Sequence, residues 1–109
     1  MFFNRRRRYN GDVAAMLPAF GIDLDEVGPM KILGMLDVAY ADKYSIYEAA
    51  LTIAYWFAFG LYQTDVGKAR VFQEDKLKPI QEDWVKKGIV RKQIFEPFIK
   101  KLEEISTKV

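Results

Sequence analysis

Histidine and cysteine are both absent from this chain of 109 residues. Without cysteine the protein has neither a disulfide nor a thiolate nucleophile, and without histidine it cannot build a Ser-His-Asp or Cys-His catalytic site. Zinc sites made from these two residue types are excluded as well. Any chemistry would have to use carboxylates, lysine, tyrosine or an oxygen-ligated metal. Because no such constellation is visible, we predict a protein that is not an enzyme and has no cofactor and no metal.

Long hydrophobic runs are also lacking. The apolar stretch 49–62 carries no charge, but its 14 residues fall short of the roughly 20 that a membrane span requires. The basic residues at 5–8 are followed by Asp12 and Pro18, and no small-residue cleavage site appears, so no signal peptide is predicted. We therefore expect a cytoplasmic protein without a membrane span.

The net charge is only +2, but its distribution along the chain is uneven. Residues 1–8 carry four arginines and no acid, and residues 9–62 carry two lysines against seven acids. Residues 63–109 carry eleven basic residues against eight acidic ones. An acidic middle between basic ends favours complementary contacts, either within the fold or with a partner.

Apolar residues are plentiful, at 50% of the chain, and they are densest in residues 45–63. Ser45 and Glu48 form an S-x-x-E capping box, the pattern of a helix start. The residues that follow are apolar on nearly every side of a helical wheel, which is typical of a helix buried on several sides. We predict that residues 45–63 form the central helix of a helical domain.

Glycine, proline and capping residues indicate two helices before the central one. The first runs from residue 10 or 11 to Phe20 and is ended by Gly21. The second begins at Pro29, because proline is favoured at the first helical position, and runs to about residues 40–42.

Two further helical segments follow the central helix. Asp65, after Thr64, caps a helix that Pro79 either breaks or kinks before Gly88 ends it. The last helix covers about residues 90–106, and Pro97 either kinks it or begins it. Residues 88–95 are the only strand candidate, and their alternation is brief.

These patterns together predict an all-α fold. We expect a single compact domain of four to five helices, residues 10–109, packed around the central helix. Residues 1–9 are expected to form a basic, flexible N-terminal arm.

The sixteen aromatic residues are the main functional signal. An aromatic stripe at helical spacing is usually core, but a bundle of this size has more apolar surface than four neighbouring helices can cover. Large exposed apolar patches mark interfaces, where tyrosine and tryptophan are enriched. We therefore predict that the protein acts by homo-oligomerisation or by binding a protein partner. The candidate interface residues, all in the central helix, are Tyr55, Trp56, Phe59 and Tyr62.

Two basic clusters support an alternative function, association with nucleic acid. Arginines on an arm could neutralise phosphates and give salt-dependent affinity. The sequence DWVKKGIVRK, residues 83–92, also resembles the helix-to-wing junction of winged-helix DNA-binding domains, which implies a strand after Gly88. A helix C-terminus stopped by Gly88 explains the same residues, and we favour it. The candidate contacts to phosphate or to an acidic partner are Arg5, Arg6, Arg7, Arg8, Lys86, Lys87, Arg91 and Lys92.

Overall fold

The central helix, α4, spans Ile46–Thr64 in the computed structural model, which describes residues 2–23, 25 and 43–109. It begins with the predicted capping box. The Glu48 N–H donates to Ser45 Oγ at 3.1 Å, and the Ser45 N–H donates to the Glu48 carboxylate at 3.0 Å. These bonds satisfy two donors that a helix start leaves unpaired. Residues 48–55 are all buried, as expected for a helix with neighbours on several sides.

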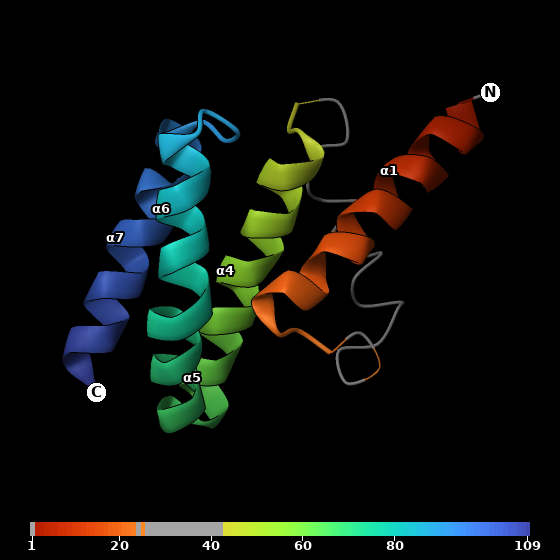
Figure 1. Cartoon of the computed structure of the whole chain (residues 1–109). Helices are drawn as coiled ribbons and strands as arrows, with labels where there is room; N and C mark the ends of the chain where they lie inside the picture. Colours follow the sequence, from red (N-terminus) through yellow and green to blue (C-terminus); the bar gives the residue numbers. More distant parts are fainter. Residues whose placement is uncertain (1, 24, 26–42) are drawn as a thin grey trace.

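Helices from both ends of the chain flank α4 (Figure 1). On one side lie α1, Phe2–Met16, and the short 3-10 helix η1, Leu17–Phe20. On the other side lie α5, η2, α6 and α7, which span Val66–Phe72, Gln73–Leu77, Lys78–Lys86 and Lys92–Lys108. Residues of α4 contact α1, η1, α5, η2 and α7. The result is a single all-α domain, with no strand in the part of the chain that the structure describes.

Side chains from several helices close the core around α4. Phe20 meets Trp84 of α6 edge to face, with ring centroids 5.5 Å apart, and Tyr55 of α4 stacks on Phe95 of α7 at 5.8 Å. Fully burying a large apolar side chain contributes about 1.5–3 kcal/mol. The largest fully buried side chains are Phe20, Phe95, Leu17, Ile22, Leu51, Leu77 and Val13.

The N-terminal helix is longer than the sequence pattern predicted. Residues 2–9, which the sequence analysis assigned to an arm, belong to α1, because arginine is a good helix former and no proline or glycine interrupts them. The hydroxyl of Tyr9 donates to the carbonyl of Tyr44 at 3.0 Å. The predicted stop at Gly21 is confirmed, with φ of 74°. The helix expected from Pro29 to residues 40–42 lies outside the described residues.

Pro79 does not break the helix after Asp65, whose side chain caps it by accepting from the Lys68 N–H at 3.1 Å. The five residues of η2 form a π-helical turn immediately before α6, and Pro79 lies in the first turn of α6. A proline clashes with the carbonyl four residues earlier in an ordinary helix. The wider π turn relieves that clash, so α5, η2 and α6 follow one another without a loop.

Residues 88–95, the strand candidate, form the turn between α6 and α7 and the start of α7 instead. Gly88 has φ of 71°, its N–H donates to the Val85 carbonyl at 3.0 Å, and the Ile89 N–H donates to Trp84 at 2.9 Å. This pair of bonds is a Schellman motif, which ends a helix. Helix α7 then begins at Lys92, so neither a wing nor a strand follows Gly88, and Pro97 lies inside α7 rather than at its start.

Candidate protein interface

The structure separates the four predicted interface residues of α4. Tyr55, Phe59 and Tyr62 are buried in the core, whereas 48% of Trp56 is exposed. The hydroxyl of Tyr62 is also engaged inside the protein, since it donates to the side-chain oxygen of Gln73. Only Trp56 of the four can therefore contact a partner without rearrangement of the core.

The indole of Trp56 is held at its edges by neighbouring groups and left open on its outer part. It meets Phe59 and Phe98 edge to face, with ring centroids 6.0 Å and 6.2 Å apart. The Lys101 ammonium lies 5.8 Å from the indole centroid and 4.8 Å from that of Phe59, a cation–π arrangement. These contacts hold the ring in place before any partner arrives.

A glycine follows Trp56 one helical turn later on the same side of α4. Gly60 is exposed, and a Cβ added to it would meet nothing within 4 Å. Because residues i and i+4 lie on one helix face, the projecting indole stands beside a shallow gap. We call this area the Trp56 surface and define it by Trp56, Gly60, Phe98 and Lys101. Gly60 was not among the predicted interface residues, because that prediction rested on aromatic side chains alone.

The basic residues proposed for phosphate contacts also divide into two groups. All of Arg8, Lys86, Lys87, Arg91 and Lys92 are exposed, but the guanidinium of Arg91 is engaged by the Glu48 carboxylate. Arg5, Arg6 and Arg7 lie in α1. Lys87 makes a surface ion pair with Asp83 at 3.1 Å. Association with nucleic acid stays a prediction from the sequence.

The partner of Arg91 is the capping residue Glu48, 97% of which is buried. The guanidinium donates to both carboxylate oxygens, from Nε at 2.9 Å and from Nη2 at 2.8 Å, and the Arg91 backbone N–H donates at 2.9 Å. Nη2 also donates to the Lys43 carbonyl at 2.8 Å. One carboxylate thus joins the start of α4 to the turn before α7.

These contacts set the electrostatics of the carboxylate. The hydrogen bond from Arg91 lowers the pKa of Glu48 from 4.5 to about 2, against the effect of burial, which raises it. Burial, and secondarily the Glu48 charge, raise the pKa of the nearby Tyr9 hydroxyl. The shifts therefore belong to a structural ion pair rather than to an acid and base arranged for catalysis.

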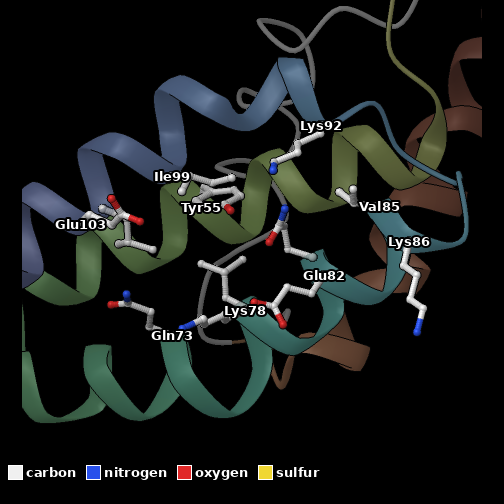
Figure 2. A pocket seen from close by; sticks show the side chains of 12 residues that line it. Tyr55, Gln73, Lys78, Glu82, Val85, Lys86, Lys92, Ile99 and Glu103 are labelled. Atoms are coloured by element: carbon white, nitrogen blue, oxygen red, sulfur yellow. The ribbon is translucent and has the colours of Figure 1, made fainter.

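A pocket of about 410 Å³ lies between α6 and α7 (Figure 2). Tyr55 of α4 and Gln73 of η2 line it together with residues of both flanking helices. Figure 2 shows Lys92 directed into the group of lining side chains and Lys86 directed away from it.

Comparison of the chain with models of protein families, with curated proteins and with solved structures finds no match in any of the three. Among the described helices, none is both long and apolar enough to cross a membrane. Residues 2–23, 25 and 43–109 also contain no group of three or more acidic side chains that could hold a metal ion. We therefore infer the function from the surfaces and the pocket of this chain.

Proposed function

We propose that this protein acts by association rather than catalysis, and that its partner at the Trp56 surface is a second copy of the same chain. The observation that carries the proposal is the exposure of nearly half of Trp56 beside Phe98 and Lys101. Tryptophan is among the residues most enriched at the energetic centres of interfaces. A ring already fixed by its neighbours loses little conformational entropy on binding. We propose this association for the cytoplasm, the compartment that the sequence predicts.

The shape of the Trp56 surface favours self-association over an unrelated partner. In a two-fold dimer each patch meets itself, so a surface that carries both a projection and a matching gap is self-complementary. Trp56 and Gly60 lie about 6 Å apart along α4, four residues at 1.5 Å each. Two antiparallel copies of α4, related by an axis between these positions, would each place an indole over the partner's glycine.

The test is the solution mass of the protein by light scattering over a range of concentrations. The wild type is expected to dimerise, and Trp56→Glu should give single chains with unchanged helical circular dichroism. Gly60→Leu is the sharper variant, because it adds apolar surface but fills the gap. A nonspecific sticky patch would associate more strongly after this change, whereas the proposed packing predicts weaker association.

A matched control lies on α5. Val71 is 60% exposed and apolar but is not part of the Trp56 surface. Val71→Glu should therefore leave the mass unchanged. A wild type that remains a single chain at high micromolar concentration contradicts the self-association proposal.

A further inference from the structure

The pocket between α6 and α7 has the dimensions of a ligand site. Its volume of about 410 Å³ falls within the roughly 300–1,000 Å³ that is usual for small-molecule pockets. Helix α6 supplies one wall and α7 the other, while Tyr55 reaches the pocket from the central helix. Because Gln73 and Leu77 of η2 also line it, four helical elements that pack in the core hold the pocket in shape.

The hydroxyl of Tyr55 suggests that the pocket binds a ligand. Only 2% of this residue is exposed, and its hydroxyl makes no hydrogen bond to any residue that the structure describes. Every fully buried side-chain nitrogen or oxygen among those residues does have a partner. The Tyr55 hydroxyl must therefore open into the pocket, where a bound molecule can satisfy it.

Two more polar groups face the same space. Gln81 is 8% exposed and lines the pocket, and its side-chain amide makes no hydrogen bond to a residue that the structure describes. Lys92, at the start of α7, extends its ammonium into the pocket (Figure 2). Burial raises the pKa of Tyr55, so its hydroxyl keeps its proton at neutral pH and acts as a donor. A phenol, an amide and an ammonium together offer donors to an acceptor, and the ammonium favours an anion.

The rest of the lining limits what kind of anion fits. Two exposed carboxylates, of Glu82 and Glu103, border the pocket beside the ammonium groups of Lys78 and Lys92, so the lining disfavours more than one negative charge on a ligand. The aliphatic part of the wall is formed by Leu77, Val85, Ile99 and Leu102. The ligand should therefore carry one negative charge and an apolar body.

We propose that this pocket binds a small organic monoanion, a carboxylate attached to an apolar chain or ring. The carboxylate accepts from Tyr55, Gln81 and Lys92, and the apolar body lies against the aliphatic wall. The pocket lining shares no residue with the Trp56 surface, although Tyr55 stacks on Phe98 with ring centroids 5.6 Å apart, so the proposal does not require self-association.

Calorimetric titration with a series of probes that share an eight-carbon chain tests the head group. Octanoate should bind at least about tenfold more tightly than octan-1-ol or octylammonium, because only the carboxylate is an anion that can form an ion pair with the Lys92 ammonium. Acetate should bind more weakly than octanoate, since it lacks the apolar body. Equal affinity for octanoate and octan-1-ol, or no heat of binding with octanoate, overturns the proposal.

Three variants of the intact chain locate the site. Lys92→Gln and Tyr55→Phe should each weaken octanoate binding about tenfold. Lys86→Gln is the matched control, because Lys86 also lines the pocket but is directed away from it, and it should bind as the wild type does.

Tyr55→Phe also separates a binding role from a structural one. The hydroxyl has no partner in the described chain, so its removal should leave the urea midpoint unchanged or raise it. A variant that is less stable yet binds octanoate as tightly as the wild type overturns the proposal.

Discussion

At the scale of single residues, Glu48 has two structural roles that are usually separate. Its carboxylate accepts the Ser45 N–H as part of a helix cap, and it accepts three bonds from Arg91, which lies 43 residues later in the chain. A buried carboxylate is tolerated only when its acceptor sites are satisfied. The cap of α4 and the contact of α4 with the turn before α7 therefore depend on the same two oxygens.

Glu48→Gln is expected to change how stability depends on pH. The folded-state pKa of about 2 lies below the ordinary 4.5, so the ion pair stabilises fully above pH 4.5. That contribution is at most about 3.5 kcal/mol, at about 1.4 kcal/mol per pKa unit, and it is lost as the pH falls from 4.5 towards 2. Urea unfolding of wild type and variant at pH 7, 4 and 2.5 should show a difference that shrinks with acid. A difference independent of pH contradicts the assignment.

Arg91→Lys is expected to destabilise the protein although the charge is kept. A lysine ammonium cannot reproduce the fork that reaches both Glu48 oxygens and the Lys43 carbonyl. The control is Lys87→Arg in the neighbouring exposed pair with Asp83, where either side chain suffices. Thermal melts at pH 7 should show a clear loss for the first variant and almost none for the second.

At the scale of helices, replacing glycine by alanine is expected to change stability in opposite directions at two positions, because their backbone conformations differ. A Cβ at Gly60 or at Gly88 would meet nothing within 4 Å, so neither position is limited by space. Gly60 lies within α4, whereas Gly88 has the left-handed φ of 71° that the Schellman motif requires.

Gly60→Ala should therefore stabilise the monomer by about 0.5–1 kcal/mol, the usual gain in a helix interior. Gly88→Ala should destabilise it by about 1–2 kcal/mol, the cost of a left-handed residue with a Cβ. Urea unfolding at low micromolar protein measures both without a contribution from association. Effects of the same sign would contradict the assigned backbone conformations.

The central helix offers a comparison between its cap and its core. Ser45→Ala removes the oxygen that accepts the Glu48 N–H, a loss of about 1 kcal/mol in typical helices. Ile53→Ala truncates a side chain that is 98% buried, for which about 2–5 kcal/mol is usual. If urea unfolding showed a larger loss of stability for Ser45→Ala than for Ile53→Ala, α4 could not be the centre of the core.

At the scale of the whole molecule, the proposed dimer links stability to concentration. A partner that binds only the folded chain raises the melting temperature as the protein concentration rises. The wild type should therefore melt several degrees higher at a hundredfold greater concentration, whereas Trp56→Glu should melt at one temperature throughout. Differential scanning calorimetry at the two concentrations gives the comparison. A concentration dependence that survives in Trp56→Glu would place the contact elsewhere.

The sequence by itself determined the features that depend on near neighbours. The capping box at Ser45, the cap at Asp65 and the glycine stops at Gly21 and Gly88 are all as predicted. Each is made by residues within about five positions of one another, so local pattern contains the needed information. The all-α fold follows from the same signals, repeated along the chain.

Only the tertiary structure decided which sides of α4 are covered. A helix that is apolar on nearly every side gives little indication of where its neighbours lie, so Tyr55 and Trp56 were both predicted as interface residues although Tyr55 is buried and Trp56 is exposed. The pairing of Glu48 with Arg91 and the approach of Lys92 to Tyr55 join residues 43 and 37 positions apart. Such contacts arise from the packing of whole helices. The way the helices pack in the core, and not the number of residues between two side chains, decides which of them meet.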